Sequence, residues 1–186
     1  MRLFVGIPLA DTVERELAAA VERLRENRAH ALDGLRWTEP ESLHITLQFL
    51  GNATAEQLEC LKVRLDEVRS DAAPVQLGQF RCFDRAGILF ADVAVTAELA
   101  ALQRLVVNAT SCCGFVAEER PFHPHITLAR AKGQGRGTDL RKLLNKAGSG
   151  PPFTPFLGRE FLLYESHTGA AGAKYEIRRR FALIGP

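Results

Sequence analysis

The tetrapeptide His-Ile-Thr-Leu occurs twice in this chain, beginning at His44 and again at His125. Imidazole titrates near neutral pH, so one His can accept a proton while another donates one. The hydroxyl groups of Thr46 and Thr127 could hold an anionic oxygen between them. The two motifs offer no obvious Ser or Cys nucleophile. These residue types therefore suit in-line attack on a phosphodiester, with one His as the base and the other as the acid.

The first motif predicts a strand with one polar and one apolar face. Side chains alternate between faces along a strand, so His44, Thr46 and Gln48 share one side. The opposite side is apolar and would pack on a core: Leu43, Ile45, Leu47 and Phe49. A slip of one residue in strand register would bury the His, so the pattern specifies which face is presented.

The second motif repeats the arrangement, with His125 and Thr127 on one face and Ile126 and Leu128 on the other. Two such strands side by side would gather two His and two Thr around one point. A lone His at such a position is most often half-buried and structural, but the repeated face pattern argues against that interpretation for the pair.

A zinc site is the main alternative at these motifs. Three His side chains could serve as ligands: His44, His123 and His125. No thiolate lies near either motif in the sequence, and His-x-His with an intervening Pro is a weak zinc motif. We therefore do not favour a zinc site here. The other two His, His30 and His167, are expected to be ordinary surface residues.

Composition indicates one compact domain over residues 1–186, with two lobes as an option. The chain is 46% hydrophobic and 25% charged, which is ordinary for a globular fold with a core. Its net charge of +2 is too small for a protein that coats nucleic acid, so any RNA contact should be local. We see neither a membrane-spanning run nor a signal peptide, and expect a cytoplasmic protein that contacts no membrane.

Four Cys are present: Cys60, Cys82, Cys112 and Cys113. They form no Cys-x-x-Cys pair and no zinc-finger spacing. In a cytosolic protein we expect them to be reduced thiols, and a secreted domain stapled by disulfides is not favoured.

Hydrophobic periodicity predicts an α+β fold. The expected helices cover residues 13–24, 55–68, 97–109 and 140–147, with Asp11, Thr54 and Thr96 as N-caps. The expected strands cover residues 2–7, 35–37, 43–50, 75–83, 88–95, 115–118, 125–130, 160–166 and 175–184. A β-α-β pattern with hairpins recurs in each half, which indicates a duplicated unit with two lobes.

Longer segments strengthen these patterns. RLFVGIPL, RWTEPESLHITLQFLG, GFVAEERPFHPHITLAR and FLLYES, read in order along the chain, resemble the two-histidine (2H) phosphoesterase superfamily. Within it they are most similar to the RNA 2′,3′-cyclic phosphodiesterases, formerly described as 2′-5′ RNA ligases. The resemblance implies a bilobal, pseudo-duplicated fold with two antiparallel sheets facing a central cleft, and no cofactor. It implies that His44 and His125 are catalytic and that Thr46, Thr127 and Arg130 bind the substrate phosphate.

Two positions fit this resemblance less simply. Strict alternation places Arg130 on the face opposite His125, so a phosphate-binding role requires the strand to end or bulge near Ala129. Gln48 stands where Lys or Ala is frequent in the family, and we interpret this difference as harmless.

The activity that the resemblance implies is hydrolysis of a 2′,3′-cyclic phosphate at an RNA 3′ end, giving a 2′-phosphate. His125 would activate water and His44 would protonate the departing 3′ oxygen, although the roles could be reversed. The expected partners are RNA 3′ ends, with tRNA fragments as one option, and the expected state is a monomer. Alternatives are a 2′-5′ RNA ligase or phosphodiesterase, a small cyclic-nucleotide hydrolase, a phosphate-binding RNA module without turnover, and the zinc enzyme.

Basic residues near the motifs could steer RNA, although charged residues are more often simply solvated. Four of them border the second motif: Lys132, Arg136, Arg141 and Lys142. Two more, Arg178 and Arg180, are expected to share a face of the last strand.

Overall fold

The computed structural model describes residues 1–26, 34–131, 140–141, 144, 152–169 and 172–184. Its helices are α1 (Asp11–Glu26), α2 (Ala55–Asp66), α3 (Ala97–Ser111) and the short 3₁₀ helix η2 (Pro40–Ser42). Its strands are β1 (Arg2–Pro8), β2 (Leu35–Trp37), β3 (His44–Asn52), β4 (Ala73–Val75), β5 (Leu77–Phe83), β6 (Ile88–Val93), β7 (His125–Ala131), β8 (Phe156–Gly158), β9 (Glu160–Gly169) and β10 (Gly172–Ala182). Within these ranges no helix is both long and apolar enough to cross a membrane.

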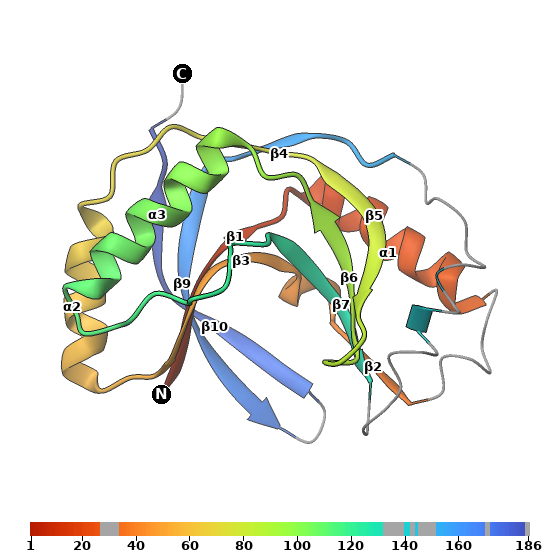
Figure 1. The fold of residues 1–186 in the computed structure, drawn as a ribbon, viewed down its shortest axis with the longest axis horizontal. Coiled ribbons are helices and arrows are strands. Elements are labelled where there is room, and N and C mark those ends of the chain that lie inside the picture. The colour runs from red at the N-terminus through yellow and green to blue at the C-terminus, as the bar shows by residue number, and fades with distance from the viewer. Residues whose placement is uncertain (27–33, 132–139, 142–143, 145–151, 170–171, 185–186) are drawn as a thin grey trace.

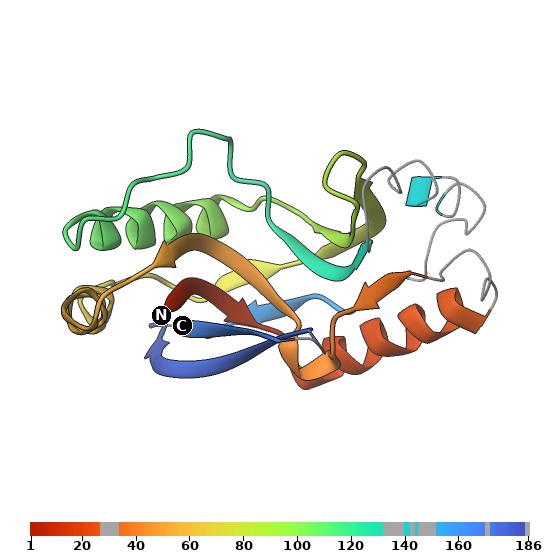
Figure 2. The ribbon, with the colours of Figure 1, turned by 90° about the horizontal axis from the view of Figure 1, so that it is seen from below.

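The described strands form two four-stranded antiparallel sheets and one two-stranded pair. The strand orders are β10-β9-β1-β3 and β2-β7-β6-β5, and β4 pairs with β8. Figures 1 and 2 place α2 and α3 at one end of the molecule and α1 toward the other end, where β5 also lies. Buried side chains from both sheets belong to one main apolar cluster. The predicted α+β class with two antiparallel sheets is confirmed.

The two motif strands occupy equivalent places in two similar β-α-β units. In β1–α1–β3 the strands are antiparallel neighbours, and His44 lies opposite Pro8. In β6–α3–β7 the strands are again antiparallel neighbours, and His125 lies opposite Asp92. The duplication inferred from the repeated pattern is therefore visible in the strand register.

Each motif strand bulges at the Leu of its His-Ile-Thr-Leu sequence. In β3, Gly6 pairs with Thr46 and Val5 with Gln48, so Leu47 is an extra residue. In β7, the equivalent pairs also skip one residue, Leu128. A bulge puts two successive residues of one strand opposite one residue of its partner, which reverses the alternation of faces beyond it.

The bulges correct three sequence-based placements. Gln48, predicted to share the face of His44, is buried, and its side-chain oxygen accepts a 2.7 Å hydrogen bond from Thr110 Oγ1. Phe49, predicted to face the core, is 48% exposed. Arg130, which strict alternation put opposite His125, is exposed beyond the bulge on the same side as Thr127.

Two predicted helix caps are confirmed and one is wrong. Thr54 Oγ1 accepts from the backbone N–H of Gln57, whose side chain completes the capping box, and Thr96 Oγ1 accepts from Leu99 N–H. The first helix instead begins at Asp11 itself. There the N–H of Glu14 donates to the carbonyl of Ala10.

Two predicted strands also differ from the structure. The segment 75–83 is divided between β4 and β5 at Gln76, whose amide nitrogen donates to the carbonyls of Leu77 and Phe153. The segment 115–118 is no strand, because the N–H of Phe115 bonds to the Thr110 carbonyl at the end of α3. Most of the predicted helix 140–147 lies outside the described residues.

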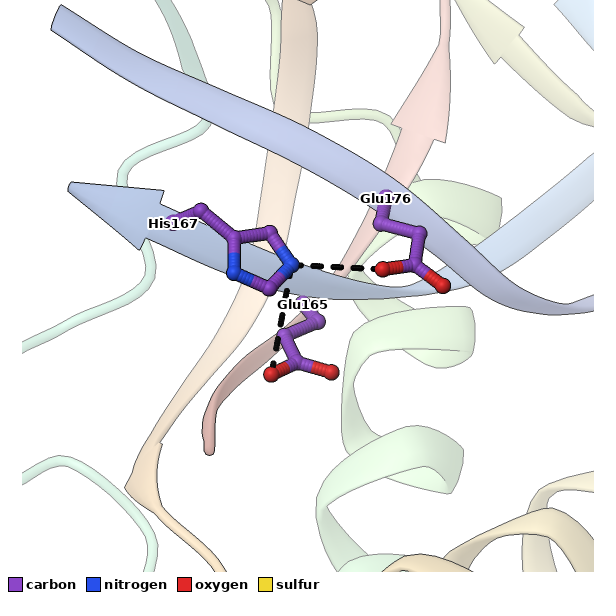
Figure 3. Close-up of side chains that lie close together, drawn as sticks. All are labelled: Glu165, His167 and Glu176. Carbon is purple, nitrogen blue, oxygen red and sulfur yellow. Dashed lines mark hydrogen bonds and ion pairs between the residues drawn. The ribbon is translucent and has the colours of Figure 1, made fainter. Parts of the chain in front are cut away.

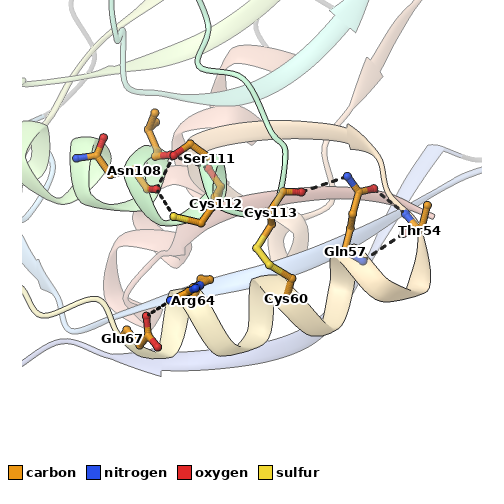
Figure 4. Close-up of a disulfide and its surroundings, with 11 residues drawn as sticks. Thr54, Gln57, Cys60, Arg64, Glu67, Asn108, Ser111, Cys112 and Cys113 are labelled. Atoms are coloured by element: carbon orange, nitrogen blue, oxygen red, sulfur yellow. Dashed lines mark hydrogen bonds and ion pairs between the residues drawn. A yellow bond between two sulfur atoms is a disulfide. The ribbon is translucent and has the colours of Figure 1, made fainter.

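The prediction that all Cys are reduced is wrong for one pair. Cys60 of α2 and Cys113, just after α3, form a disulfide, with Cα atoms 5.8 Å apart (Figure 4). The amide nitrogen of Gln57 also donates to the Cys113 carbonyl at 3.3 Å. The packing of α2 beside α3 brings these distant positions together, which sequence spacing could not reveal. Cys82 and Cys112 are free thiols.

Candidate active site

The predicted site residues meet where β3 and β7 lie against each other. Thr46 and His125 line the same cavity, which has a volume of about 530 Å³. His44 lies close enough to His125 for the charge of that ring to act on its protonation. The structure therefore brings the two motifs, which are far apart in the sequence, to one place.

Both catalytic candidates hold their rings in the same way. Nδ1 of His44 lies 2.7 Å from the Ser42 carbonyl oxygen, and Nδ1 of His125 lies 2.8 Å from the His123 carbonyl oxygen. A carbonyl oxygen only accepts, so each Nδ1 must carry the hydrogen. Each neutral ring then has its lone pair on Nε2, and that nitrogen can take or return a proton.

His44 lies among aromatic rings on the cleft side of the first sheet. Its ring centroid is 4.6 Å from that of Phe4, 5.1 Å from Tyr175 and 5.7 Å from Tyr164. Burial lowers the pKa of His44 to about 4, and the hydrogen bond to the Ser42 carbonyl offsets this only in part. In the free protein at neutral pH, this ring is uncharged.

His125 has a similar aromatic setting, with Phe83 and Phe90 each 5.2 Å away between ring centroids. Burial lowers its pKa, and the charges of His123 and Arg130 lower it further. The carbonyl bond to His123 and the carboxylate of Asp92 act in the opposite direction. The Asp92 carboxylate therefore affects the pKa of His125, whereas no carboxylate is among the groups that shift the pKa of His44.

Asp92 is a site residue that the sequence analysis missed. One carboxylate oxygen lies 3.0 Å from His123 Nε2, and the other lies 3.2 Å from Arg81 Nε. His123, expected only as a weak zinc ligand, instead contributes the carbonyl that holds His125. Asp92 lies opposite His125 in β6, just as Pro8 lies opposite His44 in β1. This equivalence could have identified Asp92, but it can be recognised only when the strand register is known.

The charge of Arg130 acts on the rings of both His44 and His125. Its positive charge contributes to the lowered pKa of His44 and of His125, after the larger effect of burial. It also acts on Tyr175, whose pKa burial raises. The bulge at Leu128 therefore puts Arg130 on the same side of β7 as Thr127, near enough for its charge to act on both rings.

The zinc alternative finds no support in the contacts of its ligands. Among the described residues, the one group of His, Cys, Asp and Glu side chains close enough to share an ion is Glu165, His167 and Glu176 (Figure 3). Arg178 already bonds to Glu165 at 3.1 Å and to Glu176 at 3.2 Å. The predicted surface residue His167 is exposed and lies 3.2 Å from Glu176.

The basic residues expected to steer RNA are largely paired where they are described. A register shift in β10 makes Arg178 an extra residue, and Arg180 bonds to Glu160 at 2.7 Å. Arg141 pairs with Asp84. The other candidates, together with His30, lie outside the described residues: Lys132, Arg136 and Lys142.

Comparison with known proteins agrees with this geometry. A sequence model of the 2′-5′ RNA ligase superfamily matches residues 13–170. The chain belongs to this superfamily. The RNA 2′,3′-cyclic phosphodiesterase of Aeropyrum pernix is 32% identical over 136 residues, covering 71% of this chain and 77% of that protein. The one from Archaeoglobus fulgidus is 27% identical over 184 residues, covering 97% and 99%.

The fold of this chain is also similar to that of a solved structure. A crystal structure of E. coli LigT complexed with 3′-AMP superposes with a TM-score of 0.76, covering 98% of this chain and 97% of that one. Its sequence is 24% identical, so the likeness concerns the fold. Both His-Ile-Thr-Leu motifs fall within the part of the chain that the superfamily model matches.

Proposed function

We propose that this protein hydrolyses the 2′,3′-cyclic phosphate at the 3′ end of RNA and leaves a 2′-phosphate. One observation carries the proposal: two imidazoles near enough for the charge of one to act on the other, each with Nδ1 bonded to a carbonyl and Nε2 available. The relatives from Aeropyrum pernix and Archaeoglobus fulgidus are RNA 2′,3′-cyclic phosphodiesterases, which supports this choice of substrate. RNA bearing this terminus, tRNA fragments included, is the proposed substrate.

The phosphate is held by groups that stay in place during the reaction. The hydroxyls of Thr46 and Thr127 share faces with the two His and donate to the non-bridging oxygens. Arg130 adds a guanidinium, which matches two phosphate oxygens at once. As water attacks, negative charge grows on these oxygens, and donors that are already positioned stabilise it.

The two rings divide the proton transfers. His125 takes a proton from the attacking water, and His44 gives one to the departing 3′ oxygen. The ring with the lower pKa forms the stronger acid, and His44 has its pKa lowered to about 4. The Asp92 carboxylate supports His125 as the stronger base. The bound phosphodiester anion raises the pKa of both rings and so favours the protonated form that the acid needs.

One chain supplies every group in this scheme, which supports the inference of a monomer built as one domain over residues 1–186. A second candidate reaction uses the same site. If the 5′ hydroxyl of another RNA replaces water, the same acid–base pair joins the two ends through a 2′-5′ bond or reverses that step. The name of the superfamily keeps this alternative open.

The test is a product analysis on a short RNA ending in a 2′,3′-cyclic phosphate, with EDTA present. We expect a 2′-phosphate product, because the 3′ oxygen is the leaving group. A second reaction with an added 5′-hydroxyl RNA separates hydrolysis from ligation. A 3′-phosphate product would overturn the proposed placement of water and leaving group, and no turnover by the folded protein would overturn the function.

A further inference from the structure

Phe49 occupies the place in the first half of the molecule that Arg130 occupies in the second. Each is the second residue beyond the bulged Leu of its motif. Phe49 lies opposite Phe4 of β1, and Arg130 lies opposite Ile88 of β6. The bulge turns both side chains toward the catalytic face. The two halves therefore present different groups from equivalent positions, a cation from one and an aromatic ring from the other.

The Phe49 ring is unusually open for an aromatic side chain next to a core. It is 48% exposed, and its centroid lies 6.2 Å from that of Phe4. Strict strand alternation would have buried it, so the bulge removes a large apolar side chain from the core. Exposed aromatic rings beside a polar cleft are typical of binding sites.

The cavity beside the catalytic rings begins at Phe49 and extends over α3. Its wall includes the apolar side chains of Phe83, Val107 and Phe122. Polar amides from α3, Gln103 and Asn108, line the same space. A concave site of about 530 Å³ that combines aromatic rings with a few polar groups has the size and character of a pocket for a small planar ligand.

Charge at this cavity suits a nucleic acid. Arg104 and Arg120 line it, together with one carboxylate, Glu118, which pairs with Arg120 at 3.1 Å. The catalytic end of the same cavity is marked by Thr46 and His125. A nucleotide whose phosphate lies at that end would extend its base toward Phe49 and α3.

We propose that this cavity is the binding site for the base of the RNA terminal nucleotide, with Phe49 as the surface on which the base stacks. The inference rests on the proposed function, because it identifies where the nucleoside of that substrate lies. Stacking on an aromatic ring tolerates every base, so Phe49 should strengthen binding without strong base preference.

The test compares binding of two ligands, adenosine 2′-monophosphate and inorganic phosphate, by calorimetry without turnover. In Phe49→Ala, nucleotide affinity should fall about five- to hundredfold, the usual effect of losing one stacking ring, while phosphate affinity stays unchanged. Phe49→Trp should keep or strengthen nucleotide binding. Val63→Ala, at an exposed apolar position on α2, is the control and should leave both affinities unchanged.

Two outcomes would overturn the inference. Unchanged nucleotide affinity in Phe49→Ala would show that the base binds elsewhere. An equal loss of nucleotide and phosphate affinity would show that Phe49 shapes the phosphate-binding site and contacts no base. Because neither ligand is hydrolysed, both results are independent of whether the proposed hydrolysis occurs. If Phe49→Ala fails to fold, Phe49→Leu, which keeps apolar bulk and removes the ring, decides the same question.

Discussion

His44 and His125 each donate Nδ1–H to the backbone carbonyl two residues earlier in the chain, over 2.7 and 2.8 Å. The identical contact fixes the same tautomer in both rings and leaves both Nε2 atoms for proton transfer. What differs is the surroundings. Both rings lie among aromatic side chains, but a carboxylate, that of Asp92, is among the groups that shift the pKa of His125 and not among those that shift the pKa of His44.

The pH dependence of kcat/KM should be bell-shaped and lie on the acid side of neutrality. Catalysis needs one ring charged and the other neutral. Burial lowers the pKa of His44 to about 4 and lowers that of His125 below its ordinary value. Above both pKa values neither ring carries the proton. Steady-state kinetics across the range should show kcat/KM falling above about pH 6.5. A rate that stays level from there to alkaline pH would contradict the two-His scheme.

Replacing Asp92 by Asn should lower the pKa of His125 further. The carboxylate raises that pKa, whereas burial is the largest effect that lowers it. NMR titration of the His125 ring protons measures the shift directly, and the alkaline limb of kcat/KM should move to lower pH. Glu176→Gln is the matched control, because Glu176 pairs with His167. An unchanged His125 titration in Asp92→Asn would show that the carboxylate is not coupled to the catalytic ring.

Acid should destabilise the fold through His44. Its pKa is lowered on folding, so the unfolded chain binds more protons between about pH 4 and 6.5. The contribution to stability is therefore present above the unfolded pKa and is lost as the pH falls toward 4. Thermal unfolding of wild type and His44→Gln across this range should show a steeper loss of Tm in wild type. Parallel curves would refute the proposed burial of a neutral ring.

Substituting Gly6 by Ala should damage both stability and catalysis. A Cβ atom there would lie 2.8 Å from the Ile45 carbonyl oxygen and 3.3 Å from Cδ2 of His44. The Ile45 carbonyl belongs to β3, so it can move away only if the pairing of β1 with β3 shifts. Such a shift would displace the His44 ring. We expect a lower Tm and a lower kcat with the same phosphate affinity. A variant with wild-type Tm and kcat would mean that the strands adjust without moving His44.

A substrate with sulfur in place of the 3′ bridging oxygen should separate the roles of the two rings. Thiolate leaves without protonation, so His44→Ala should lose about 10²- to 10⁴-fold on the oxygen substrate and little on the sulfur one. His125→Ala should be equally impaired on both. The opposite pattern, with His125→Ala rescued by sulfur, would exchange the assignments of acid and base.

Much of this site could be predicted from the sequence because alternation holds up to each bulge. His44, Thr46, His125 and Thr127 precede the bulged Leu residues, and all lie on the predicted face. Beyond the bulge the prediction fails, as Phe49 shows. A bulge depends on two residues facing one on a partner strand, and the local sequence of one strand does not contain that information.

The other features that the sequence analysis did not predict also depend on tertiary contacts. Asp92 acts on His125 because β6 and β7 pair in a particular register. Cys60 and Cys113 meet because α2 packs beside α3. Neither relationship has a local signature, whereas the caps at Thr54 and Thr96 involve residues three apart and were predicted correctly.

The most direct test of the central claim is the rate of cleavage of an RNA 2′,3′-cyclic phosphate by wild type, His44→Ala and His125→Ala. His167→Ala is the control, since His167 is an exposed His paired with Glu176. We predict that each catalytic substitution lowers kcat by about 10²- to 10⁴-fold with the fold intact, and that the control keeps wild-type activity. Substantial turnover by either folded catalytic variant would contradict the acid–base pair.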